Sequence, residues 1–99
     1  MKIRWTKEAL TRLLEVETYI AEDNPAVAID FVDSLISYAE KIAENPERGR
    51  VVPELSVKSI REVIYKNYRI VYILQEESID ILTVFESHRK LRDNEINQE

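Results

Sequence analysis

Residues 59–74 read SIREVIYKNYRIVYIL, and this stretch decides the fold class of the chain. Branched and aromatic residues dominate on both sides of the dipeptide KN, which is typical of two β-strands joined by a tight turn. Paired residues of antiparallel strands run in opposite order, so one pairing fixes all the others. The register predicts four opposing pairs: Tyr65 with Tyr68, Ile64 with Arg69, Glu62 with Val71 and Ile60 with Ile73.

The flanking sequence extends this hairpin into an α+β fold. The segment SIDILTVFE (78–86) predicts a third strand after a short connection. Upstream, apolar residues recur at helical spacing after Thr6 and again after Asn24 and Pro25, which favour the start of a helix. We expect an N-terminal strand, an antiparallel helical hairpin, a three-stranded antiparallel meander and a short C-terminal tail or helix. The length suits one domain spanning residues 1–99.

The same register gives the hairpin two apolar faces. The first face is formed by Arg61, Val63, Tyr65, Tyr68, Ile70 and Tyr72, and the second by Ile60, Glu62, Ile64, Arg69, Val71 and Ile73. Two helices cover only one face, so we expect the second to expose apolar residues around Glu62 and Arg69, and such patches usually bind a partner. The alternative is that Glu62 and Arg69 form a surface ion pair, which would contribute less than about 1 kcal/mol to stability. Loops and the C-terminal tail would then cover the nearby apolar groups.

The composition excludes several classes of protein. The chain has no cysteine and one histidine, which excludes a disulfide framework, a thiolate zinc site and a multi-histidine metal site. We expect no cofactor and no metal. The N-terminus is charged and no apolar run approaches the roughly 18 residues of a membrane helix. The sequence therefore predicts neither a signal peptide nor a membrane span, and the cytoplasm is the expected location.

The net charge of −5 is unevenly distributed along the chain. Residues 1–47 hold five basic and ten acidic side chains, whereas residues 48–92 hold nine basic and six acidic ones. The part that forms the sheet is therefore the basic part. This asymmetry either indicates an anionic partner or reflects ordinary solvated charges.

The order of these elements, together with the segments YIAEDNP, NPERGRVVPEL, IRE and NYRIVY, resembles the RelE/ParE superfamily of bacterial toxins. The resemblance covers about residues 3–92. It implies the toxin of a type II toxin–antitoxin module, held inactive by a cognate antitoxin of the ParD or RelB kind. The second apolar face of the sheet would be the seat of that antitoxin.

The superfamily contains two activities. RelE-like members are ribosome-dependent endonucleases that cut messenger RNA by attack of a ribose 2′-oxygen on the neighbouring phosphate, which needs a base, cations and an acid. The resemblance implies Arg69, Arg89 and His88 for those roles. An exposed loop histidine is the simpler reading of His88. ParE-like members lack the nuclease residues and poison DNA gyrase by binding.

The departures from RelE favour the ParE-like branch. Ile60 and Glu62 stand where RelE has lysines, and a carboxylate there repels phosphate. The acidic run 93–95 lies near the position of RelE's C-terminal tyrosine, and the segments GRVVPEL and IRE are closer to ParE. We therefore expect a gyrase inhibitor that acts by binding and has no catalytic residues. The alternatives are a RelE-like, ribosome-dependent endonuclease that cuts messenger RNA and a non-toxic family member that only binds antitoxin.

The expected binding residues lie on the second face of the sheet, in the loop before it and just after the last strand. They are Glu62, Arg69, Val71, Ile73, Arg50, His88 and Arg89. They are expected to contact the antitoxin or the target.

Overall fold

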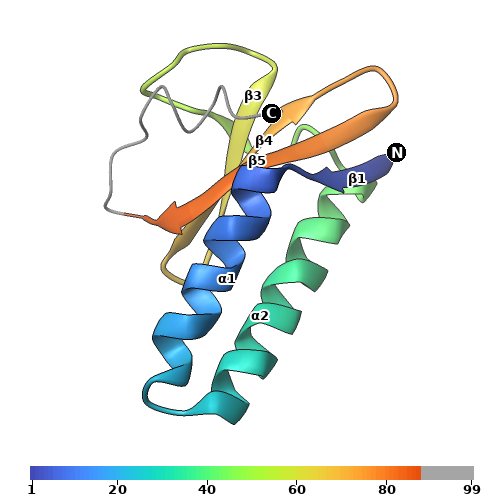
Figure 1. Cartoon of the computed structure of the whole chain (residues 1–99). Helices are drawn as coiled ribbons and strands as arrows, with labels where there is room; N and C mark the ends of the chain where they lie inside the picture. Colours follow the sequence, from blue (N-terminus) through green and yellow to red (C-terminus); the bar gives the residue numbers. More distant parts are fainter. Residues whose placement is uncertain (88–99) are drawn as a thin grey trace.

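A computed structural model gives the structure of the chain and describes residues 1–87. Two helices pack against one face of a five-stranded sheet (Figure 1). The elements are β1 (Lys2–Trp5), α1 (Lys7–Ala21), α2 (Pro25–Glu40), a 3₁₀ turn (Lys41–Glu44), β2 (Arg50–Val51), β3 (Ile60–Tyr65), β4 (Tyr68–Leu74) and β5 (Ser78–Glu86). The predicted α+β fold is confirmed.

The strands lie in the order β1-β5-β4-β3-β2. β1 runs parallel to β5, and the other neighbours are antiparallel. The four predicted pairs of the β3–β4 hairpin are confirmed, from Tyr65 with Tyr68 to Ile60 with Ile73. The sequence did not predict β2, whose two residues Arg50 and Val51 are too few to show any alternation.

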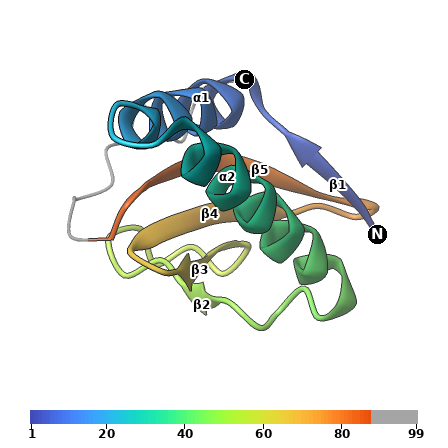
Figure 2. The same cartoon turned by 90° about the horizontal axis from the view of Figure 1, so that it is seen from below.

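The helical hairpin covers the predicted first face of the sheet (Figure 2). The helices contribute Ala9, Leu13, Val16, Val32, Leu35 and Ala39 to the core, and the sheet contributes Val63, Tyr68, Ile70, Tyr72, Ile79, Ile81 and Val84. Asn24 caps α2 through its side chain, and Pro25 occupies the first turn, as the sequence predicted.

The second face of the sheet is covered around Glu62 and Arg69, so the predicted exposure there is wrong, although Ile64 on the same face is 44% exposed. Val71 is fully buried, Glu62 is 1% exposed and Arg69 is 5% exposed. The reason is the loop between β2 and β3, which packs Val52 and Leu55 into a second apolar cluster on this face. That cluster also holds Ile60, Val71, Leu82, Phe85 and Ile73.

Thr6 joins the start of α1 to β5. Its Oγ1 accepts a hydrogen bond from the Ala9 N–H at 3.1 Å and lies 2.9 Å from the Ile81 carbonyl oxygen, to which it donates. The Leu82 carbonyl is 3.1 Å away, at a β-bulge where β5 shifts register against β4. The threonine therefore stabilises a helix start and an irregular strand at once.

Replacing Thr6 with alanine is expected to lower the free energy of unfolding by about 1–2 kcal/mol, because the cap and the contact with β5 are both lost. Urea unfolding followed by circular dichroism measures this loss. Thr6→Ser keeps the oxygen and should lose much less. Equal losses in both variants would assign the effect to the methyl group instead.

Arg4 and Asp80 join β1 to β5. The guanidinium donates from Nε and Nη2 to the two carboxylate oxygens, both at 3.0 Å, and the Ser78 hydroxyl donates to the same carboxylate. These hydrogen bonds, that from Arg4 first, hold the pKa of Asp80 below its ordinary value despite the opposing effect of burial.

The Asp80 ion pair predicts a pH dependence of stability. The unfolded chain binds a proton at Asp80 more readily than the folded chain, so this contribution is present above about pH 4 and is lost as the pH falls through the folded pKa. Arg4→Gln should therefore be less stable than the parent at pH 7, and the difference should shrink as the pH falls below about 4. Urea unfolding across this range provides the measurement, and a constant difference would contradict it.

Candidate functional site

Four charged side chains meet on the second face of the sheet. Glu62 lies at the centre with its side chain fully buried, and accepts from Arg69 Nε at 2.7 Å and from Arg50 Nε at 2.5 Å. Arg69 also donates to both carboxylate oxygens of Glu54, at 3.1 and 2.9 Å. We call Arg50, Glu54, Glu62 and Arg69 the ion-pair cluster.

Arg69 is held firmly within this cluster. Its guanidinium carbon lies 4.9 Å from the centre of the Phe85 ring, a cation–π contact that adds to the two carboxylates. Burial acts to lower the pKa of Arg69, but the hydrogen bonds that Arg69 donates to Glu54 and Glu62 outweigh this effect, and the pKa is raised. An incoming phosphate would have to displace carboxylates that already occupy these donors.

The structure brings together three of the residues expected to bind, Arg50, Glu62 and Arg69. Of these, only Arg50 is well exposed, at 65% of its side chain. Val71 is buried and Ile73 is half-buried in the second cluster. His88 and Arg89 lie outside the described residues. The sequence missed Glu54, because nothing in a loop's pattern shows which strand residue it will reach.

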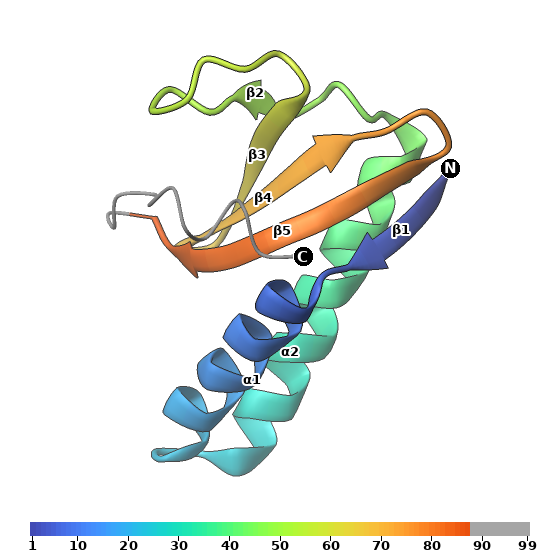
Figure 3. The ribbon, with the colours of Figure 1, turned by 45° about the horizontal axis from the view of Figure 1, so that its top comes forward.

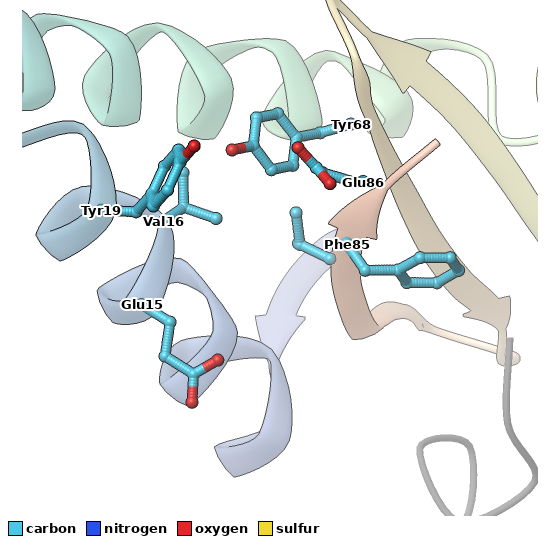
Figure 4. Close-up of a pocket in the computed structure, with 7 residues that line it drawn as sticks. Glu15, Val16, Tyr19, Tyr68, Phe85 and Glu86 are labelled. Carbon is cyan, nitrogen blue, oxygen red and sulfur yellow. The ribbon is translucent and has the colours of Figure 1, made fainter. Parts of the chain in front are cut away.

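A cavity of about 370 Å³ opens between α1 and the ends of β4 and β5. Its lining residues are Glu15, Val16, Tyr19, Tyr68, Val84, Phe85 and Glu86. Figure 4 shows the rings of Tyr19 and Tyr68 directed toward one another, with Glu86 beside Tyr68. Burial and then the negative charge of Glu86 raise the pKa of Tyr68. We call this cavity the tyrosine pocket.

The outer side of α1 is unusually apolar. Leu10, Leu14 and Tyr19 are 52%, 65% and 68% exposed. Leu14 and Tyr19 line a shallow groove of about 330 Å³, and Tyr19 also lines the tyrosine pocket. The sequence carried a signal for this surface, since Leu10 and Leu14 lie beside the apolar stripe of the helix and not on it.

The part of the chain that the structure describes shows neither a metal-binding cluster nor a membrane-spanning helix. Residues 1–87 contain no group of three histidine or acidic side chains that could hold a metal ion. They also contain no helix long and apolar enough to cross a membrane.

A helical hairpin packed on one face of a five-stranded sheet is the arrangement of the RelE/ParE fold class. A solved structure described as the chromosomal ParDE TA system from P. aeruginosa superposes with a TM-score of 0.73, covering 87% of this chain and 95% of its own, at 18% identity. Residues 3–91 match the family described as the ParE toxin of the type II toxin-antitoxin system parDE. The chain belongs to this ParE toxin family.

Two relatives agree with this assignment. A protein of Sinorhizobium fredii named as the toxin Y4kP is 35% identical over 91 residues, which cover 90% of this chain and 91% of the relative. Toxin RelE2 of Caulobacter vibrioides is 31% identical over 84 residues, which cover 84% of this chain and 91% of the relative. The chain is therefore a ParE-like toxin of a type II toxin–antitoxin system.

Proposed function

We propose that this toxin inhibits DNA gyrase by binding and is neutralised by a cognate antitoxin in the cytoplasm. The observation that carries the proposal is the enclosure of Arg69 by Glu54 and Glu62. Arg69 is the residue that the RelE-like alternative would need as a phosphate-binding cation.

The charge balance of the ion-pair cluster argues against RNA cleavage. Cleavage by a ribose 2′-oxygen needs cations aimed at the developing negative charge on phosphorus. The cluster pairs two arginines with two glutamates, so it offers a phosphate no net positive charge, and the buried Glu62 would repel it. A toxin without such a cation set acts more readily by binding than by chemistry.

Binding by an antitoxin is supported by the exposed side chains of α1. Large apolar side chains with half or more of their surface in water are typical of surfaces that a partner covers. Leu10, Leu14 and Tyr19 meet this description and lie on one helix. A partner that covers α1 would remove this surface from water and could block the toxin's approach to its target.

The similarity to toxin RelE2 keeps the ribosome-dependent endonuclease as the second candidate function. In that case His88 and Arg89 would act together with Arg69 on messenger RNA. The third candidate is a family member that binds antitoxin without being toxic.

The deciding experiment is controlled expression in a bacterial host, with separate pulse labels for DNA and protein synthesis. We expect DNA synthesis to fail first, and His88→Ala and Arg89→Ala to remain toxic. Purified toxin should also inhibit supercoiling by gyrase. Early failure of protein synthesis, with toxicity lost in both variants, would support the endonuclease. Unimpaired growth together with tight antitoxin binding would support the third candidate.

A further inference from the structure

β5 is much longer than the strand that covers its outer edge. β1 pairs only with residues Ser78 to Ile81 of the nine-residue β5. Figure 3 shows β5 continuing past the end of β1. Among the described residues 1–87, the second half of β5 therefore has β4 on one side and no strand on the other.

The backbone groups of that second half can be oriented from the register. The Ser87 N–H donates to the Asn67 carbonyl at 2.8 Å, so the backbone of Ser87 faces the side of β4. Hydrogen-bonded and non-hydrogen-bonded pairs alternate along antiparallel strands. Val84 and Glu86 therefore point their N–H and C=O groups away from β4, toward the open edge.

The first half of β5 supports this orientation. The carbonyls of Glu77 and Ile81 accept hydrogen bonds from the N–H groups of Lys2 and Thr6, on the same outer edge. Before the β-bulge, the backbone N–H and C=O groups of the odd-numbered residues of β5 face the outer edge. After the bulge those of the even-numbered residues face it, because the bulge inserts one extra residue into β5. Within residues 1–87, no hydrogen bond reaches Val84 or Glu86 from that side.

The tyrosine pocket opens beside this edge and has a negative character. Val84 and Glu86 belong to both the pocket and the edge, and Val16 adds apolar lining from α1. Glu15 is paired with Arg12 at 2.7 Å, whereas Glu86 has no ion-pair partner among residues 1–87. The raised pKa of Tyr68 reflects burial and then the charge of Glu86.

These features together select one kind of occupant. An unpaired strand edge binds an extended segment through main-chain hydrogen bonds, and neighbouring pockets select its side chains. A carboxylate without a partner, beside two tyrosine rings, suits an ammonium or guanidinium group. The pocket is large enough for a lysine or arginine side chain.

We propose that the outer edge of β5 at Val84 and Glu86 binds an extended segment of the antitoxin, which adds a strand and places a lysine or arginine side chain in the tyrosine pocket. The inference rests on the proposed neutralisation by an antitoxin. It moves the expected seat from the covered second face to the end of β5, and it assigns the partner a basic side chain.

The test measures the affinity of the full chain for its antitoxin by isothermal titration calorimetry. Glu86→Gln should weaken binding about tenfold or more, because a charge-assisted hydrogen bond in the pocket is lost. The matched control is Glu40→Gln, which removes one exposed negative charge from the end of α2 and should leave the affinity within about twofold.

A second pair of variants isolates the strand edge. Glu86→Pro removes the outward N–H, which β4 does not use, and proline is tolerated at such edge positions. It should bind about fivefold more weakly than Glu86→Ala, which keeps the N–H. Amide hydrogen exchange at Val84 and Glu86 in the unmodified chain should slow when the antitoxin binds. This measurement tests the strand edge even if the proline variant fails to fold.

The outcomes separate this inference from the proposed function. Failure of the unmodified chain to bind any antitoxin overturns the proposed neutralisation and the inference with it. The inference alone is overturned if the parent binds the antitoxin, the affinity of Glu86→Gln lies within twofold of the parent's, and amide hydrogen exchange at Val84 does not slow. Self-association that Glu86→Pro abolishes would assign the edge to a second copy of the chain and would also overturn it.

Discussion

Replacing Arg69 with methionine is expected to lower the free energy of unfolding by about 3 kcal/mol. The substitution leaves Glu62 with a fully buried side chain and only the largely exposed Arg50 as a partner. Removal of one partner from a buried ion pair costs about 3–5 kcal/mol, and the remaining contact with Arg50 places this loss at the lower end. Urea unfolding followed by circular dichroism at pH 7 gives the value.

Two further variants test the cause of that loss. Arg50→Met removes the exposed cation of the ion-pair cluster and should cost less than about 1 kcal/mol. The double variant Glu62→Leu with Arg69→Met removes both buried charges and should recover much of the stability. An Arg69→Met variant within about 0.5 kcal/mol of the parent would mean that Glu62 is hydrated in solution.

The burial of Arg69 changes how its variants should be interpreted in a toxicity assay. A variant that unfolds loses toxicity whatever the target is. Loss of toxicity in Arg69→Ala therefore does not distinguish an endonuclease from a gyrase inhibitor. His88 and Arg89, which the RelE-like alternative also requires, provide the more informative substitutions.

The sequence predicted the fold through patterns that depend on neighbours along the chain. The period of two in residues 59–74 and the turn KN specified the β3–β4 register, which the structure confirms. The apolar stripes of α1 and α2 and their capping residues also depend only on residues close together in the sequence. β2 escaped prediction because two residues carry no period, and its pairing with β3 is a tertiary contact.

The candidate site was less accessible to sequence reasoning. The register correctly placed Glu62 and Arg69 on one face, but their burial depends on Val52 and Leu55 from a loop without periodicity. Glu54 could be assigned to the cluster only once that loop was folded. The tyrosine pocket joins Tyr19 on α1 to Tyr68 on β4, and no local pattern links positions so far apart.

Replacing Gly49, the only glycine in the chain, with alanine is expected to cost about 3 kcal/mol of stability. A Cβ atom at this position would lie 2.5 Å from the Tyr72 hydroxyl oxygen and 2.6 Å from the backbone oxygen of Glu62. Overpacking costs typically about 1–3 kcal/mol, and a displaced Tyr72 would also lose its bonds to the Gly49 N–H and the Pro46 carbonyl. The melting temperature and urea midpoint measure the effect.

The double variant Gly49→Ala with Tyr72→Phe identifies which of the two contacts matters. It removes the hydroxyl but leaves the new Cβ 2.6 Å from the Glu62 carbonyl, which belongs to the backbone of β3 and cannot rotate away. The second substitution should therefore recover little of the stability lost by the first. Full recovery would show that β2 can move away from β3 at little cost. In that case the loop carrying Val52 and Glu54 would not be held firmly against the sheet, and the buried state of Arg69 would lose its main structural support.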